Sequence, residues 1–256
     1  MRELLAPLRP GARVLDLGAG SGSFSTERGD LAVVRADLAP PRTGAPSGPG
    51  GAYVLADAAR LPFAPGAFDL VISHHSLEHF AELDAALREI GRVTAPSGGL
   101  FIAVPDAGTL TDRIYRWLGK GGGHVNAFRS PDEVVRLVER WTGLEHRGTC
   151  ALSSGLSFLN AHNFIAPPPR KIALFAFGNE RFLAVFVWLL RWLDRRLGAG
   201  LSRYGWAFYF GNAAPPEDGR PWINVCVRCG AGHPEALLGN RWAYRCPDCG
   251  GFNLRT

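Results

Sequence analysis

The sequence predicts an α/β fold with a doubly wound, mostly parallel sheet of seven strands. An apolar strand at residues 14–17 runs into a glycine-rich turn that opens a helix, with Gly18, Gly20 and Gly22 at every second position. Glycine suits such a turn because the backbone must bend sharply and let a ligand approach without an intervening Cβ. Further apolar segments at 31–37 and 53–58 carry an aspartate near their carboxyl ends. Open α/β sheets bind ligands at that edge.

The other elements follow from apolar periodicity and turn residues. Residues 81–93 have apolar positions at helical spacing, and Ser130 followed by Pro131 and Glu133 is typical of a helix start. Residues 39–52 are dense in Pro, Gly and Ser and predict a loop. In chain order we expect one or two helical turns at 2–8, helices at 81–93 and from Ser130, a turn at 96–99, and strands at 14–17, 31–37, 53–58, 68–73, 100–104, 144–151 and 222–227.

Two segments match no core element of this fold. Residues 106–128 contain a glycine run at 119–123, which suits the hinge of a mobile flap. Residues 152–220 are interpreted as an apolar insertion or lid. Within it, residues 182–197 are apolar on nearly all sides but fall short of the about 20 residues that a membrane span needs. They indicate a buried core helix, a wall of an apolar substrate cavity, or an interfacial helix whose Trp and Arg side chains contact lipid head groups.

Four of the five cysteines form two Cys-x-x-Cys pairs separated by a spacer of 16 residues. This spacing is typical of a zinc ribbon with four thiolate ligands and no open coordination position. Because so small a module has little apolar core, metal binding should supply its folding free energy. We therefore divide the chain into a main domain at 1–225 and a ribbon at 226–256. The expected zinc ligands are Cys226, Cys229, Cys246 and Cys249.

The composition is that of an ordinary globular protein, with a net charge of +5 and a pI near 9.2. This charge permits contact with RNA, an anionic membrane or an acidic substrate. Arginine carries nearly all of it, since lysine occurs only at positions 120 and 171, so codon bias is an equally simple explanation. The first strand begins about a dozen residues from Met1, which leaves no room for a signal sequence and predicts a cytoplasmic protein.

Taken together in their order, the motifs of residues 1–150 resemble the class I S-adenosylmethionine-dependent methyltransferases, especially the small-molecule branch. The matching pieces are the stretches 15–22, 56–63 and 68–73, together with Asp37. The resemblance implies a Rossmann-like methyltransferase fold in which the glycines close on the methionine part of the cofactor and Asp16 orients their loop. It implies that Asp37 binds the ribose hydroxyls and that Asp57 and Ala58 bind the adenine edge. The implied cofactor-binding residues are Asp16, Gly18, Ala19, Gly20, Gly22, Asp37, Leu38, Asp57, Ala58 and Ser73.

Methyl transfer from a sulfonium demands mainly alignment and the exclusion of water, so a general base is optional. If the acceptor is a hydroxyl or a carbon acid, a histidine would serve. His74 and His75 follow the fourth strand where the methyl group should point, and His124 and His79 are further candidates. Each of these histidines could instead be a packing or hydrogen-bonding residue.

The sequence therefore predicts methyl transfer to a small, apolar or lipid-like acceptor bound beneath residues 105–128 and 152–220, with peripheral membrane contact left open. One alternative is an RNA methyltransferase that holds nucleic acid on the ribbon, where Arg241, Trp242 and Arg245 combine charge with stacking surfaces. The basic pI favours this alternative and the apolar insertion opposes it. A second alternative is a scaffold that binds S-adenosylmethionine without catalysis.

Overall fold

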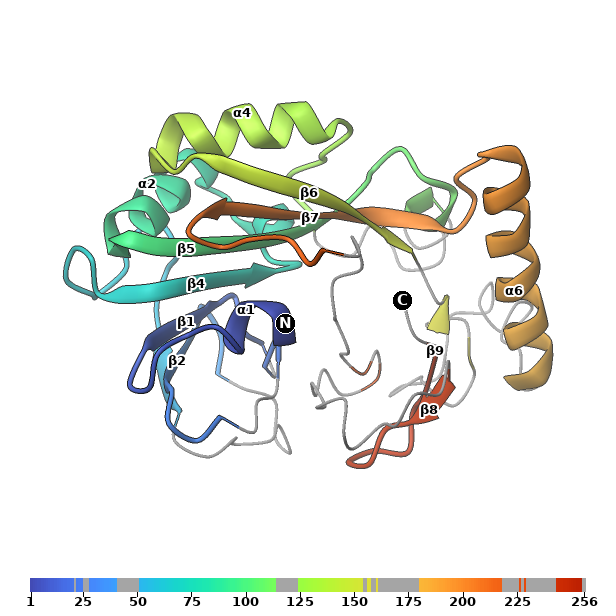
Figure 1. The fold of residues 1–256 in the computed structure, drawn as a ribbon, viewed down its shortest axis with the longest axis horizontal. Coiled ribbons are helices and arrows are strands. Elements are labelled where there is room, and N and C mark those ends of the chain that lie inside the picture. The colour runs from blue at the N-terminus through green and yellow to red at the C-terminus, as the bar shows by residue number, and fades with distance from the viewer. Residues whose placement is uncertain are drawn as a thin grey trace.

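The computed structural model of the protein (Figure 1) describes residues 1–20, 22–24, 28–40, 51–113, 124–153, 156–157, 160, 180–217, 226, 228 and 243–254. Its centre is a seven-stranded sheet with the order β3-β2-β1-β4-β5-β7-β6. The strands are β1 Arg13–Leu17, β2 Ala32–Asp37, β3 Ala52–Leu55, β4 Phe68–His74, β5 Thr94–Pro105, β6 His146–Ser153 and β7 Arg203–Gly211. The prediction of seven strands is confirmed, and the sheet is mixed: β1 to β5 pair in parallel, whereas β7 runs antiparallel to both of its neighbours.

Two helices cover one face of the sheet. The helices α2 Leu83–Val93 and α4 Pro131–Thr142 lie together above the strands in Figure 1. They bury Leu87, Ile90 and Val138 against the strands in one core cluster. On the opposite face, the short helix α1 Arg2–Leu5 packs Leu4 and Leu5 into a second cluster. Both faces of the sheet are therefore covered, as the doubly wound prediction requires.

The order in which strands are added to the sheet changes side between β1 and β4: β2 and β3 lie on one side of β1, and β4 and β5 lie on the other. Strand β1 pairs in parallel with β2 on one side and with β4 on the other. This places the carboxyl ends of β1, β2 and β4 at one edge, at the switch point where open α/β sheets bind ligands. The loops after these strands, including the 3-10 turn η1 Leu77–His79, are the elements that form the site.

Several predicted boundaries shift in the structure. The predicted turn at 96–99 lies inside β5, because the pairing with β4 skips from Thr94 to Gly99 and leaves the intervening residues as an irregularity within one strand. Ser130 takes the predicted cap position of α4, but its side chain makes no capping hydrogen bond. The third strand ends at Leu55, so Asp57 lies in the loop that follows.

The interpretation that residues 152–220 contain no core element is wrong for β7. Strand β7 inserts between β5 and β6, and Phe208, Tyr209 and Phe210 on it are fully buried. A continuous run of large apolar side chains suits a strand that is buried on both faces. The strand predicted at 222–227 lies almost wholly outside the described residues, and β7 is the strand that completes the seven described in the sheet.

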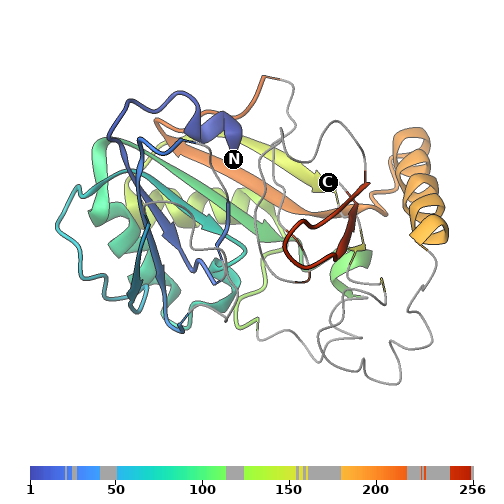
Figure 2. The same ribbon diagram turned by 90° about the horizontal axis from the view of Figure 1, so that it is seen from below.

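Helix α6 Glu180–Leu197 stands at one end of the molecule in Figures 1 and 2. It buries Leu183 and Val187 in a third cluster with Phe252 and Leu254 of a C-terminal hairpin, made of β8 Ala243–Arg245 and β9 Phe252–Leu254. The opposite face of α6 is exposed, so this helix is not a fully buried core helix. No helix in the described part of the chain is long and apolar enough to cross a membrane.

The close approach of β7 to β5 yields a test of the new strand. A Cβ on Gly205 would lie 2.1 Å from the carbonyl oxygen of Val104, a backbone atom that cannot move aside cheaply. We expect Gly205→Ala to lower the free energy of unfolding by about 1–3 kcal/mol, the usual cost of overpacking, as measured by urea denaturation. Gly29→Ala is the matched control, because nothing lies within 4 Å of its Cβ position. Equal stability of the two variants would contradict the placement of β7.

Candidate functional site

The glycine loop after β1 is fitted against the turn that follows β4. Gly18 has a φ of +70°, and a Cβ added to it would lie 2.3 Å from the Cβ of Ser76. The Ser76 hydroxyl donates to the carbonyl oxygen of Leu17 at 3.0 Å, and it lies 2.5 Å from the hydroxyl of Ser73. This buried pair of serines ties the end of β4 to the end of β1. Only glycine leaves room for that contact.

Asp16 holds the other end of the glycine loop. Its Oδ2 atom accepts a hydrogen bond from the backbone N–H of Ser23 at 2.9 Å, and its side chain is fully buried. Burial raises the pKa of Asp16, while the hydrogen bonds from Ser23 and the charge of Arg35 oppose that shift. The contact is the one expected of a residue that orients the loop.

Asp37 ends β2 and faces the same loop. Its Oδ2 atom accepts from the N–H of Gly20 at 2.8 Å, and its Oδ1 atom accepts from the N–H of Ala39 at 3.0 Å. The hydroxyl of Tyr53 lies 2.9 Å from the carbonyl oxygen of Ala39 and 3.3 Å from that of Gly20. Burial and the nearby charge of Asp37 raise the pKa of Tyr53 to about 12, so this phenol stays protonated and acts as a donor.

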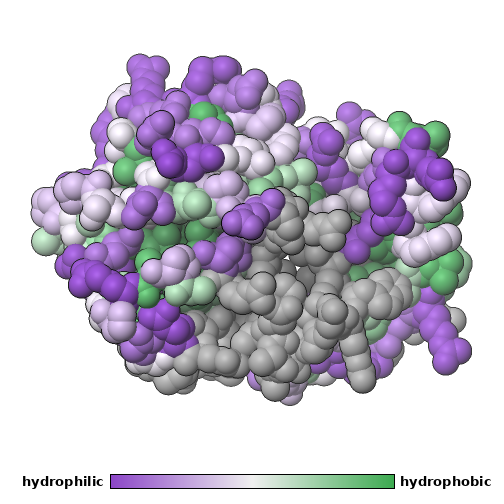
Figure 3. Space-filling view, in the orientation of Figure 1, coloured by the Kyte–Doolittle hydropathy of each residue, from purple (hydrophilic) through white to green (hydrophobic). Residues whose placement is uncertain are grey.

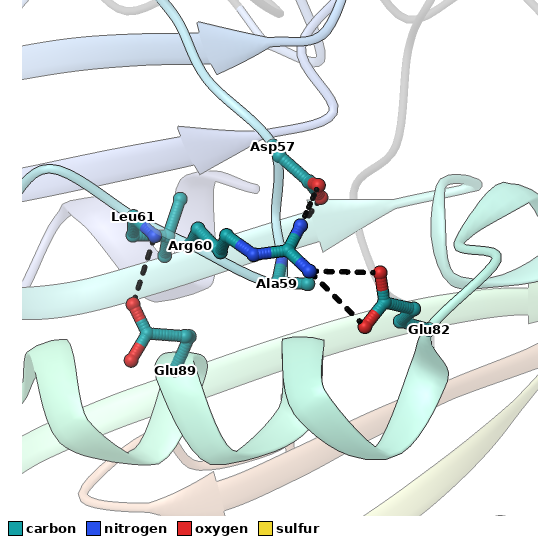
Figure 4. Close-up of polar contacts among 6 residues, drawn as sticks. All are labelled: Asp57, Ala59, Arg60, Leu61, Glu82 and Glu89. Carbon is teal, nitrogen blue, oxygen red and sulfur yellow. Dashed lines mark hydrogen bonds and ion pairs between the residues drawn. The ribbon is translucent and has the colours of Figure 1, made fainter.

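Asp57 takes part in a chain of charged side chains (Figure 4). Its carboxylate accepts from the N–H of Ala59 at 2.9 Å and pairs with Arg60 at 2.9 Å, while Arg60 also lies 3.2 Å from Glu82. The exposed pairs contribute little stability. Glu89 of α2 accepts from the N–H of Leu61 at 2.8 Å and so fixes this loop to the helix.

These loops enclose a cavity of about 350 Å³ at the carboxyl edge of the sheet. Gly18, Asp37, Leu38, Asp57 and Ala58 line it, as the sequence prediction implies. Asp16, Ala19, Gly20, Gly22 and Ser73 do not line it, and Asp16, Gly20 and Ser73 instead make the contacts that support the lining loops. The opposite wall is formed by the turn after β4 and the start of α2, with His75, Ser76, His79, Phe80, Ala81, Glu82 and Ala86.

The predicted catalytic histidines occupy different environments. His75 lines the cavity with a φ of +53°, and its Nδ1 atom lies 3.4 Å from the hydroxyl of Tyr204. His74 does not line the cavity, and its Nε2 atom is buried without a hydrogen-bond partner among the described residues. Burial and the neighbouring His75 lower the pKa of His74 well below its ordinary value, so His74 is a poor proton acceptor. His124 packs its ring against that of His79, with centroids 4.9 Å apart.

Sequence reasoning missed four residues of this site. Ser76 carries no motif of its own, and its role follows only from the approach of Gly18. Tyr53 belongs to the predicted third strand, but its hydrogen bonds to the carbonyl oxygens of Gly20 and Ala39 could be found only from the fold. Arg60 lies inside the motif around Asp57, and Tyr204 lies on the strand that the sequence did not reveal.

A second cluster of possible ligands consists of two cysteines in the turn of the C-terminal hairpin and Cys226 beside them. The sulfur atoms of Cys226, Cys246 and Cys249 all lie within 4.8 Å of one another, and those of Cys226 and Cys249 are 3.6 Å apart. Gly250, with a φ of +70°, tightens the turn so that the N–H of Gly251 faces the Cys249 sulfur at 3.4 Å. Cys229 lies outside the described residues. Thiolates so close together are the donor set that Zn²⁺ prefers.

The cavity has features that suit S-adenosylmethionine. Gly18 lines it without a side chain, and Asp37 and Asp57 present carboxylate oxygens along one wall. Each carboxylate offers about four lone-pair sites, so the contacts described above leave acceptor capacity for hydroxyl and amino groups.

The family model described as "Methyltransferase domain" matches residues 15–102, which contain every residue that lines this cavity. A malonyl-[acyl-carrier protein] O-methyltransferase from Methylococcus capsulatus is 31% identical over 195 residues, covering 66% of this chain and 71% of the relative. A demethylmenaquinone methyltransferase from Beutenbergia cavernae is 42% identical over 99 residues, covering 37% of this chain and 41% of that relative.

The solved structures include a putative methyltransferase from an antibiotic biosynthesis pathway of Anabaena variabilis. It aligns with a TM-score of 0.54 at 18% identity, covering 82% of this chain and 94% of that one, and it supports the fold alone. The family match and the relative from M. capsulatus carry the assignment further, because the family model covers the residues that line the cavity and this chain covers 71% of the relative. The chain belongs to the class I S-adenosylmethionine-dependent methyltransferases.

Proposed function

We propose that the protein transfers a methyl group from S-adenosylmethionine to a small, apolar or lipid-like acceptor. The observation that carries the proposal is the cavity between the strand ends, which has Asp37 and Asp57 on one side and His75 and His79 on the other. The relatives named above support the acceptor class, since their names specify malonyl-[acyl-carrier protein] and demethylmenaquinone. The exposed Leu38 side chain adds apolar surface at the cavity.

The reaction is an in-line displacement, and S-adenosylmethionine supplies the methyl group from its sulfonium. Gly18 lets the backbone approach the methionine part, Asp37 accepts hydrogen bonds from the ribose hydroxyls, and Asp57 with Ala58 binds the adenine edge. His75 lies on the wall opposite Asp37 and contacts the acceptor, with Tyr204 beside it. His74 packs against His75 on the side away from the cavity, with their ring centroids 4.4 Å apart. Holding the two reactants in line accounts for most of the rate gain that such a site can supply.

The proposal includes a structural zinc ion held by Cys226, Cys229, Cys246 and Cys249. Three of these sulfurs are already gathered, and backbone and side-chain N–H groups face two of them, with Asn253 at 3.3 Å from Cys226 and Gly251 at 3.4 Å from Cys249. A closed set of thiolates leaves no position for a substrate, so this zinc would stabilise the hairpin and take no part in the reaction.

Helix α6 offers a surface for an anionic membrane, where a lipid-like acceptor would reside. Its outer face exposes Phe182, Val185, Trp188, Leu189 and Trp192. The same helix also carries three arginines, Arg181, Arg195 and Arg196. Figure 3 shows hydrophobic and hydrophilic residues interleaved at this end of the molecule. Exposed Trp side chains beside Arg suit the boundary between head groups and acyl chains.

The cofactor assignment is tested at Asp37. Because a carboxylate that accepts hydrogen bonds from hydroxyls contributes about 1.5–3 kcal/mol, we expect Asp37→Asn to weaken binding of S-adenosylmethionine by about tenfold or more. Equilibrium dialysis with labelled cofactor measures this directly. Asp132→Asn on the exposed start of α4 is the matched control and should bind normally. Normal binding by Asp37→Asn would remove Asp37 from the ribose site.

The acceptor class is tested by transferring a labelled methyl group into a cell extract. We expect the label to enter the organic phase with the wild-type protein and to be lost with Asp37→Asn, because the acceptor is apolar and transfer requires the cofactor. Label released by ribonuclease would instead identify an RNA methyltransferase. Cofactor binding without any transfer would identify a scaffold.

The membrane surface is tested by sedimentation with vesicles that contain anionic phosphatidylglycerol. We expect the double variant Trp188→Ala with Trp192→Ala to bind about tenfold more weakly, since the loss of two interfacial aromatic side chains amounts to at least 1.4 kcal/mol. Leu55→Ala, which removes an exposed apolar residue on β3, should bind like the wild type. Equal binding of both variants, or no binding by the wild type, would reject the α6 surface.

A further inference from the structure

A group of metal-ligating side chains lies beside the cavity, far in sequence from the cysteine cluster. Glu78 and His79 come from the turn η1, and His124 comes from the segment before α4. Their ligand atoms all lie within 4.8 Å of one another, so small side-chain movements would bring each to the about 2.0–2.2 Å that a zinc ion requires. His79 also lines the cavity, so this group faces the space where the acceptor would bind.

The backbone fixes the position of His124 against η1. The N–H groups of Val125 and Asn126 both donate to the carbonyl oxygen of Glu78, at 2.8 and 3.0 Å. The side-chain amide of Asn126 donates to the carbonyl oxygens of Leu77 and Phe80 at 2.9 and 2.8 Å. Four hydrogen bonds therefore join two segments that are about 45 residues apart. Such support is what a preformed metal site requires of its surrounding residues.

One oxygen of the buried Glu78 carboxylate has no hydrogen-bond donor in the part of the chain that the structure describes. The Glu78 side chain is 2% exposed, and its Oε2 atom has no hydrogen-bond partner among the described residues. Its Oε1 atom lies 3.6 Å from Nδ1 of His75, which is beyond hydrogen-bond length. A buried carboxylate oxygen without a donor is costly, and a cation would remove that cost.

We propose that Glu78, His79 and His124 bind a divalent first-row transition metal, with Zn²⁺ as the expected ion. One carboxylate oxygen and two imidazole nitrogens form a ligand set found in catalytic zinc sites, which keep at least one position open for a solvent or substrate oxygen. Because His79 lines the cavity, an ion held here would lie next to the space for the acceptor. The site contains no sulfur and shares no residue with the cysteine cluster.

A metal at this position would orient and polarise an oxygen of the acceptor. It would favour acceptors with a hydroxyl, enol or carboxyl group, because such oxygens bind the ion and become more acidic there. This use in the reaction rests on the proposed methyl transfer, whereas metal binding itself does not.

The test counts zinc in the full-length protein after dialysis against buffered Zn²⁺, by atomic absorption. The wild type should hold about two ions per chain, and Glu78→Gln, His124→Gln and Cys246→Ser should each hold about one. Asp132→Asn is the matched control and should hold about two. Circular dichroism and thermal melting identify any variant that fails to fold, and His124→Gln, at a half-buried position, is the variant least expected to do so.

The combined variant Glu78→Gln with Cys246→Ser decides between the two sites. If it binds no zinc while Cys246→Ser alone binds about one ion, the site at Glu78 is established. If Cys246→Ser alone already binds none, or if Glu78→Gln and His124→Gln both retain the wild-type count, the proposal is overturned and the group is a histidine–carboxylate network. Cofactor binding is measured on the same samples. If the wild type binds no S-adenosylmethionine, the proposed function is contradicted, whereas the zinc count still tests the metal site.

Discussion

The contact between Gly18 and Ser76 is the constraint on which the site depends. It joins the end of β1 to the turn after β4, and a single methyl group at Gly18 would overlap Ser76 at 2.3 Å. On one side of this contact, Asp16 and Asp37 hold the glycine loop through the N–H groups of Ser23 and Gly20. On the other side, the turn presents His75 and His79 to the cavity. The packing of the Gly18 backbone against the Ser76 side chain thus fixes the two walls of the cavity relative to each other.

Much of the fold could be predicted because its signals are local. Strands β1 to β5 each contain an apolar run that can be recognised without its neighbours. Strand β7 could not, because its aromatic run resembles the apolar stretches around it and its place between β5 and β6 depends on pairing over about 100 residues. The cofactor residues followed from motifs, whereas Ser76, Tyr53 and Tyr204 act through contacts that no spacing encodes.

The histidines separate by environment rather than by type. His74 and His75 are adjacent in sequence, yet only His75 lines the cavity, because successive side chains leave a strand end in different directions. Burial then makes His74 a weak base, while the positive φ of His75 turns its ring toward Tyr204. Sequence could name the pair of histidines, but the backbone conformation decides which of them contacts a ligand.

The position of β7 also governs the order in which the chain can fold. In the described part of the chain, β6 pairs with β7 alone, and β7 follows it by about 50 residues. During synthesis β6 therefore leaves the ribosome before its only partner strand exists, and β5 meanwhile presents an unpaired edge. Helix α6 and the segment around it must emerge before the sheet can close. A chain cut short between residues 106 and 202 would retain the cofactor motifs and still expose the apolar edge of β5, which is buried in the complete sheet.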